Sequence, residues 1–125
     1  MRKYLYLLLL SSPFLAHGQS PSLLSPFEKS EGKQTATYAE CIAFYRQLDK
    51  ISPLLSIREM GMSDAGYPYH VVLYSNDGRF DPAEWHRKQK AVILINNGIH
   101  PGEPDGVDAS MLLLRDLDEE GPTTG

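Results

Sequence analysis

The sequence AVILINNGIHPGEPDG, residues 91–106, joins an apolar run to a short loop that holds two possible metal ligands. Its first part, residues 91–95, is continuously apolar and rich in branched side chains, a pattern typical of a strand that is covered on both faces of a sheet. The loop that follows holds His100 and Glu103, three residues apart. The stretch therefore predicts a buried strand whose end presents an imidazole and a carboxylate together.

A helix is expected on each side of the strands. Thr37 and Glu40 have the spacing of a capping box, and apolar residues recur at helical spacing behind them, so the first helix is predicted to start there and to run to about residue 50. A second helix is expected from Asp105, because Asp105 and Asp108 place negative charge at the positive end of the helix dipole. The residues that follow are apolar on nearly every side, so most of this helix should be covered by protein.

Two further strands are expected between the helices, at residues 54–59 and 69–75. The Asn-Asp-Gly sequence at residues 76–78 is typical of a hairpin turn. Helix, strand, strand, strand, helix is an α/β order. However, a strand covered on both faces, as predicted for residues 91–95, needs helices above and below it and neighbouring strands at both edges. The predicted elements are too few to supply them, so we expect the sequence to be the front part of a larger domain.

Composition and charge give few further indications of function. The chain has 125 residues, of which 42% are hydrophobic and 22% charged, as in ordinary globular proteins. Its net charge of -4 and its interspersed acidic and basic residues favour a protein that binds no nucleic acid. Cys41 is the single cysteine, so no internal disulfide can form, and its place on the apolar face of the first predicted helix favours a buried, unreactive thiol.

Residues 1–18 have the pattern of a secretory signal peptide. Arg2 and Lys3 give a positive start, an apolar run follows, and cleavage is expected after Gly18. Ser and Pro residues interrupt the apolar run and leave it too short for a membrane-spanning helix. We therefore expect a secreted or periplasmic protein that meets the membrane only through this signal. Residues 19–34, rich in Ser, Pro and Gly, are expected to form an extended, flexible lead-in.

His100 and Glu103 are suitable zinc ligands, because a neutral imidazole and an ionised carboxylate both bind zinc in known catalytic sites. Pro101 and Gly102 permit a sharp loop in which the two side chains can converge on one point. The pair also follows the carboxyl end of a predicted strand, where the sites of α/β sheets gather. By itself the His-x-x-Glu motif is weak, since such a pair arises easily by chance. The alternative is that His100 and Glu103 are ordinary loop residues that bind no metal.

A longer resemblance adds to this motif. The stretch INNGIHPGEPDGVDASMLLLRDL resembles the zinc-binding segment of the carboxypeptidase A-like zinc carboxypeptidases. Upstream, TYAECIAFYRQL resembles the first helix of that family, and IREMGMSDAGYPYHVVLYSND resembles the segment that links two early strands. These segments lie within residues 35–117, in the family's order. The resemblance implies that residues 35–125 are the N-terminal part of a zinc carboxypeptidase-like catalytic domain, a partial three-layer α/β/α sandwich with a mixed sheet.

The resemblance also implies which residues hold the metal. His100 and Glu103 would be two of the three protein ligands of one zinc ion, whereas the third ligand, a His, and the catalytic Glu lie farther along the chain in that family. No His follows Glu103 in this sequence, and Glu119 and Glu120 come too soon, in what looks like a polar tail. No catalytic residue is therefore assigned, and the chain by itself is expected to be inactive. Gly102 stands where many digestive members carry an Arg, so the loop is more similar to the bacterial and cytosolic branches.

The function implied is that of an exported zinc metallocarboxypeptidase, which hydrolyses a bond of a peptide or protein substrate through zinc-activated water. Two alternatives stay open: a related zinc amidohydrolase that deacylates an amino acid, and a non-catalytic exported binding module. Residues that bind the substrate are not assigned, because the arginines that hold a substrate carboxylate in the family would lie beyond residue 125. Tyr67, Tyr69 and Trp85 are interpreted as packing residues, and Asp105 and Asp108 as helix-start acids. Ser63 has no partner His at a readable spacing, so it is not assigned as a nucleophile.

Overall fold

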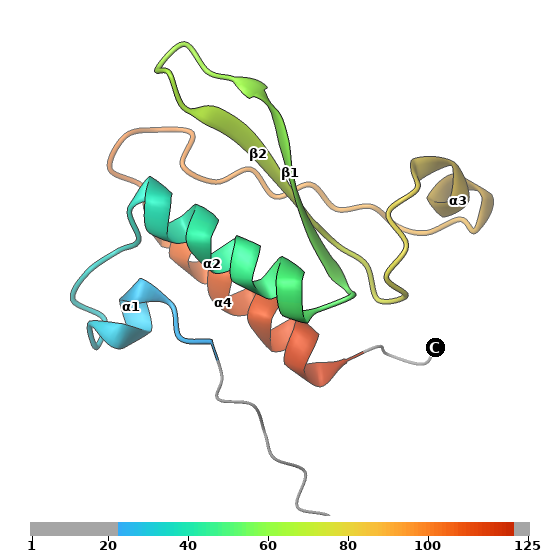
Figure 1. The fold of residues 1–125 in the computed structure, drawn as a ribbon, viewed down its shortest axis with the longest axis horizontal. Helices are drawn as coiled ribbons and strands as arrows, with labels where there is room; N and C mark the ends of the chain where they lie inside the picture. The colour runs from blue at the N-terminus through green and yellow to red at the C-terminus, as the bar shows by residue number, and fades with distance from the viewer. Residues whose placement is uncertain (1–22, 122–125) are drawn as a thin grey trace, which may run out of the picture.

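The computed structural model describes residues 23–121, so the predicted signal peptide lies outside the described residues. Figure 1 shows a two-stranded sheet with two long helices, α2 and α4, beside it. None of the helices described is long and apolar enough to cross a bilayer. The elements in chain order are α1 (Pro26–Lys29), α2 (Tyr38–Ile51), β1 (Leu55–Met62), β2 (Pro68–Tyr74), α3 (Pro82–Arg87) and α4 (Asp105–Glu120).

Both predicted helices are confirmed, and both start where the capping and charge patterns place them. The Thr37 hydroxyl accepts a hydrogen bond from the N–H of Glu40, and the Glu40 carboxylate accepts one from the N–H of Thr37 at 2.9 Å. α4 begins at Asp105 as expected but continues to Glu120. The prediction that Glu119 and Glu120 belong to a polar tail is therefore wrong, because glutamate is a good helix former and extends the helix that precedes it.

The two strands predicted at residues 54–59 and 69–75 are confirmed as the antiparallel pair β1 and β2, in which Ile57 lies opposite Val72. The turn between them is closed by a hydrogen bond of 2.8 Å from the N–H of Ser63 to the carbonyl of Tyr67. The Asn-Asp-Gly sequence that follows β2 does turn, but it leads to α3. The prediction of a hairpin there is wrong, because no further strand in the described part of the chain pairs with β2.

The core lies between α2, α4 and one face of the sheet. α2 contacts β1 on one side and α4 on the other, and Figure 1 shows α2 and α4 running side by side. Leu48 of α2, Leu55 of β1 and Met111 of α4 are 1%, 2% and 0% exposed, respectively. The mixed helix-and-strand class is thus confirmed. The sheet formed by residues 23–121 is antiparallel, however, and not the mixed sheet that was expected.

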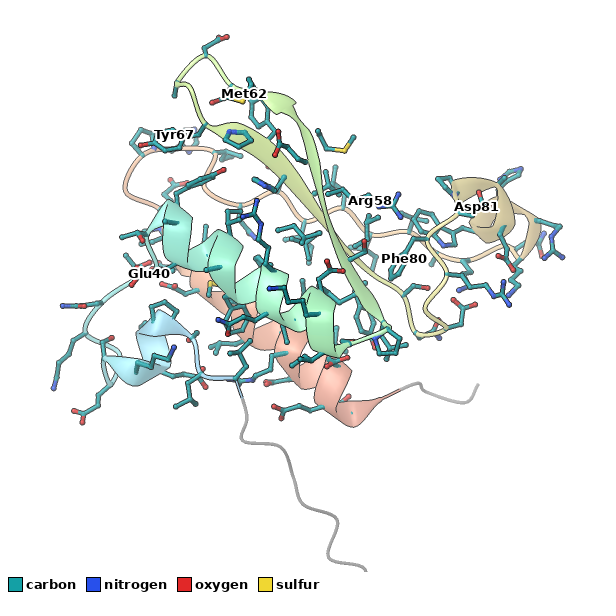
Figure 2. The ribbon with its side chains drawn as sticks, viewed as in Figure 1. Glu40, Arg58, Met62, Tyr67, Phe80 and Asp81 are labelled. Atoms are coloured by element: carbon teal, nitrogen blue, oxygen red, sulfur yellow. The ribbon has the colours of Figure 1, made fainter. Side chains whose placement is uncertain are left out.

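The opposite face of the sheet is open. Successive side chains of a strand point to opposite faces, and on this outer face Tyr69 and Val71 are 61% and 40% exposed. Arg58, which pairs with Val71 across the two strands, lies over the ring of Phe80 with 5.9 Å between the guanidinium carbon and the ring centroid (Figure 2). Within the described residues, no helix covers this face as α2 covers the other.

The segment before α2 contains a helix that was not predicted. Ser25 is the N-cap of α1, and its backbone N–H donates to the Glu28 carboxylate at 2.8 Å in a second capping box. Glu28 also receives a hydrogen bond of 2.6 Å from Nη1 of Arg115, a residue of α4 that is only 9% exposed. The expectation of an extended segment is wrong for these residues, because the capping box and the ion pair to α4 stabilise a helical turn.

Residues 91–95 differ most from expectation. They form no strand, and Val92, Ile93 and Leu94 are 70%, 83% and 89% exposed. No backbone hydrogen bond joins residues 91–95 to any other described residue. The prediction of a strand covered on both faces is therefore wrong for the described structure. The physical reason is that a strand is stabilised by the neighbours that pair with it, and residues 23–121 place none beside this segment.

Candidate metal centre

His100 and Glu103 lie in the loop before α4 and face each other. Nδ1 of His100 is 3.2 Å from Oε1 and 3.1 Å from Oε2 of Glu103. Both side chains are open to solvent, with exposed fractions of 68% and 60%. Gly102 between them has a φ of 84°, a left-handed conformation that a residue with a Cβ rarely adopts, so the loop depends on glycine at this position. The predicted convergence of the two side chains is observed.

The distance between the two side chains fits two neighbouring ligands of one zinc ion. Zinc binds imidazole nitrogen and carboxylate oxygen at about 2.0–2.2 Å in a tetrahedral arrangement, so two such ligand atoms lie about 3.3 Å apart. The observed separations from Nδ1 of His100 to the two oxygens of Glu103 are 3.2 and 3.1 Å. The same separations also suit a hydrogen bond from a protonated Nδ1 to the carboxylate. Zinc and that proton would therefore compete for the same pair of side chains.

The described part of the chain supplies no third ligand. No group of three or more His, Cys, Asp or Glu side chains that could hold a metal ion is found among residues 23–121. Asp108, on the helix that follows the loop, accepts a hydrogen bond of 3.1 Å from the N–H of Ala36 and is 6% exposed. This carboxylate therefore fixes the segment before α2 to α4, in agreement with the structural interpretation of Asp108 as a helix-start acid.

The loop is held to α4 by Asn97, a residue that the sequence patterns did not single out. Nδ2 of Asn97 donates a hydrogen bond of 2.6 Å to Oγ of Ser110. Residues 91–96 and 98–103 are all exposed, whereas Asn97 is partly buried. A polar amide between an apolar run and a glycine is too common in loops to signal such a contact, and only the packing of the loop against α4 reveals it.

The remaining candidates have structural contacts. Cys41 is half-buried, and burial together with the negative charge of Asp108 raises the pKa of its thiol to about 11, which agrees with an unreactive cysteine. Trp85 lies on α3, partly buried, and its indole N–H donates to the carbonyl of Arg79 at 2.5 Å. The ring of Tyr67 packs on that of Tyr38, with 5.0 Å between the centroids.

Two open grooves flank α2, and neither includes the metal-ligand pair. One, of about 500 Å³, lies between α1 and α2 and has Leu23 and Phe44 among its lining residues. The other, of about 460 Å³, lies between α2 and the start of β2 and is lined in part by Arg46 and His70. His100 and Glu103 therefore lie on an exposed loop outside both grooves.

Comparison with known proteins adds no relative: no family model, no curated protein and no solved structure matches this chain. The family resemblance therefore depends on the order and spacing of the sequence motifs, and the function is a proposal.

Proposed function

We propose that this chain is the N-terminal portion of an exported zinc-dependent metallocarboxypeptidase, and that His100 and Glu103 are two of its three zinc ligands. The observation that supports the proposal best is the contact between these side chains, 3.1 and 3.2 Å from Nδ1 of His100 to the Glu103 carboxylate. The motif resemblance over residues 35–117 is the second support. The pattern of a signal peptide at residues 1–18 supports export.

Each side chain of the pair has a distinct part in this proposal. His100 offers a nitrogen lone pair, and Glu103 offers an anionic oxygen that offsets part of the charge of a divalent cation. A zinc ion bound there supplies Lewis acidity and lowers the pKa of a water molecule. A third ligand and a carboxylate base are also required, and in the proposed enzyme they belong to a longer polypeptide, so this chain alone is inactive.

The proposed enzyme would also explain the exposed apolar run. In a three-layer α/β/α sandwich with a mixed sheet, residues 91–95 would pair with neighbouring strands and be covered on both faces. Their present exposure, 83% at Ile93 and 89% at Leu94, is the kind of surface that a soluble protein usually covers. The additional layer of such a domain would also cover the exposed outer face of β1 and β2.

A zinc amidohydrolase that deacylates an amino acid would use the same ligand pair. The two enzymes differ in substrate, because a carboxypeptidase hydrolyses peptides and an amidohydrolase of this kind hydrolyses acylated amino acids. An assay of the zinc-bound enzyme on both kinds of substrate distinguishes them. A non-catalytic exported binding module is the third candidate. It is favoured by the exposure of His100 and Glu103 and by the lack of a three-ligand group among residues 23–121.

Zinc affinity tests the proposed ligand pair. We expect zinc to bind the 125-residue chain weakly, and His100→Ala and Glu103→Gln each to raise the dissociation constant by about tenfold to a hundredfold. Structural zinc sites with four ligands have binding free energies of about 10–16 kcal/mol. One ligand therefore contributes about 3 kcal/mol at most in an exposed site with fewer ligands. Competition against a chromophoric chelator measures the affinity. The matched control is His86→Ala, since His86 is exposed on α3 and is followed three residues later by Gln89 instead of a carboxylate.

The proposal fails if the wild-type chain and His100→Ala bind zinc equally, or if His86→Ala weakens binding as much as His100→Ala does. In either case His100 and Glu103 are ordinary loop residues joined by a hydrogen bond, and the binding-module alternative gains support.

A further inference from the structure

The loop that carries His100 and Glu103 is joined to the rest of the molecule by one hydrogen bond. Residues 91–96 and 98–103 are exposed, and only Asn97 between them is partly buried. Among the described residues, the hydrogen bond of Asn97 to Ser110 is the one hydrogen bond that joins residues 91–103 to another part of the chain. The neighbouring Gly98 also lies near α4, since Cγ2 of Val107 is 3.6 Å from where a Cβ on Gly98 would be, but Asn97 provides the directional contact ahead of His100.

The contact is shaped by two residues on one face of α4. Gly106 and Ser110 are four residues apart, so they lie on the same side of the helix, one turn from each other. The Asn97 amide lies against both: Nδ2 is 2.6 Å from Oγ of Ser110, and Oδ1 is 2.7 Å from where a Cβ on Gly106 would be. A side chain at position 106 would displace this amide. The absence of a Cβ at Gly106 thus makes room for Asn97.

The same helix fixes the other end of the loop. α4 begins at Asp105, two residues after Glu103, so residues 98–103 are closed between the Asn97 contact and the helix start. Fixing both ends of a short loop reduces the conformations open to the residues within it. His100 and Glu103 both lie inside this closed segment, which keeps the imidazole close to the carboxylate.

We propose that Asn97 is the positioning residue of the candidate metal centre, and that its hydrogen bond to Ser110, across Gly106, holds His100 beside Glu103. The zinc-binding part of this inference rests on the proposed function, whereas the ordering of the loop by Asn97 does not require a metal. Positioning residues act by keeping ligand side chains near their binding geometry before the metal arrives.

Two measurements on the 125-residue chain test the role of Asn97. The first is the ¹⁵N relaxation of residues 98–103 in the metal-free protein, and the second is the zinc dissociation constant. We expect Asn97→Ala to increase fast motion of the loop and to weaken zinc binding by about threefold to tenfold, the range that one hydrogen bond supports. Asn96→Ala is the matched control, because Asn96 is the exposed neighbour of Asn97, and it should change neither measurement.

Two further variants separate positioning from general stability. In Asn97→Asp the new carboxylate can accept a hydrogen bond from the Ser110 hydroxyl, so we expect it to restore most of the loop order and zinc affinity that Asn97→Ala loses. Gly106→Ala should displace the Asn97 amide while improving the helix propensity of α4. We therefore expect Gly106→Ala to loosen the loop and to weaken zinc binding without lowering the melting temperature, a combination that a purely structural role does not give.

Each outcome distinguishes this inference from the proposed function. If Asn97→Ala leaves both loop motion and zinc affinity as in the wild type, the positioning role is overturned even when His100→Ala abolishes binding. If Asn97→Ala loosens residues 98–103 but the wild type binds no zinc, the anchoring of the loop is supported and the metal centre is overturned. Loosening by Asn96→Ala to the same extent would also overturn the specific role of Asn97.

Discussion

The Arg115 guanidinium is the most buried cation in the described part of the chain, and its partners explain how it is accommodated. Its Nη1 donates to both oxygens of Glu28, at 2.8 and 2.6 Å, and to the carbonyl of Leu23 at 3.3 Å. Burial alone would raise the pKa of Glu28, but the hydrogen bonds from Arg115 and Ser25 outweigh it and lower the pKa below 4.5. The contacts of one residue of α4 thus fix the segment that contains α1.

Glu28→Gln should remove most of this stabilisation. Because the substitution leaves a buried guanidinium with weaker partners, we expect the free energy of unfolding at pH 7 to fall by about 1–2 kcal/mol. A carboxylate whose pKa is lowered on folding stabilises the protein above its ordinary pKa of 4.5 and loses that effect as the pH falls. The difference between wild type and Glu28→Gln should therefore shrink below about pH 4.5, as measured by urea unfolding across pH.

Glu31→Gln is the control for this substitution. Glu31 is 81% exposed and pairs with an exposed Lys33, so its replacement should change the free energy of unfolding by less than about 0.5 kcal/mol. Equal losses at pH 7 and pH 3 for Glu28→Gln would contradict the assignment to its charge.

At the scale of elements, α2 organises the molecule because it buries one face and is capped at its start. Its apolar residues lie at helical spacing and include Phe44, Tyr45 and Leu48, which are all buried. This face contacts β1 on one side and α4 on the other. A helix of this kind is stabilised mainly by packing of its apolar face, so its centre matters more than its ends.

Leu48→Ala tests the central place of α2. Leu48 is 1% exposed, and we expect its truncation to lower the free energy of unfolding by about 2–4 kcal/mol, the range for a fully buried leucine. Ile51→Ala in the same helix is the control: Ile51 is 69% exposed and should change stability by less than about 0.5 kcal/mol. Circular dichroism during denaturant unfolding measures both, and similar losses at the two positions would contradict the proposed core.

At the scale of the whole molecule, the described chain has one covered sheet face and two open apolar surfaces. The outer face of the hairpin is one, with Tyr69 and Val71 exposed. The other is the run at residues 91–95, which reaches 89% exposure at Leu94. Contiguous exposed apolar surface of this kind marks a place where protein contacts form. We therefore expect the described chain to self-associate at high concentration through this run.

Leu94→Lys should reduce that association without unfolding the protein. Because Leu94 contributes little to the core, the free energy of unfolding should change by less than about 0.5 kcal/mol, whereas light scattering and binding of a hydrophobic dye should both decrease. Gln89→Lys adds the same charge to an exposed residue outside the run and should leave both signals as in the wild type. An equal decrease in the two variants would show that net charge, and not the apolar run, controls association.

The candidate site was predictable only in part. The His-x-x-Glu spacing, with Gly102 between the two residues, indicated that both side chains could converge. Nδ1 of His100 and Oε2 of Glu103 lie 3.1 Å apart. Asn97 was not predictable, because its role depends on Gly106 and Ser110 meeting it across the turn between the loop and α4. Such a contact joins residues whose spacing carries no pattern of its own.

Capping boxes, apolar periodicity and helix-start acids act between residues a few positions apart, so α2, β1, β2 and the start of α4 could be predicted from local patterns. Tertiary contacts were needed to show that residues 91–95 stay unpaired and that α1 is held against α4, although the capping box of α1, from Ser25 to Glu28, is itself a local pattern. A strand needs a partner to satisfy its backbone, and the described residues bring none to the apolar run. α1 is held in place by the ion pair between Glu28 and Arg115, a residue far along the chain that reaches Glu28 because α4 packs beside α2.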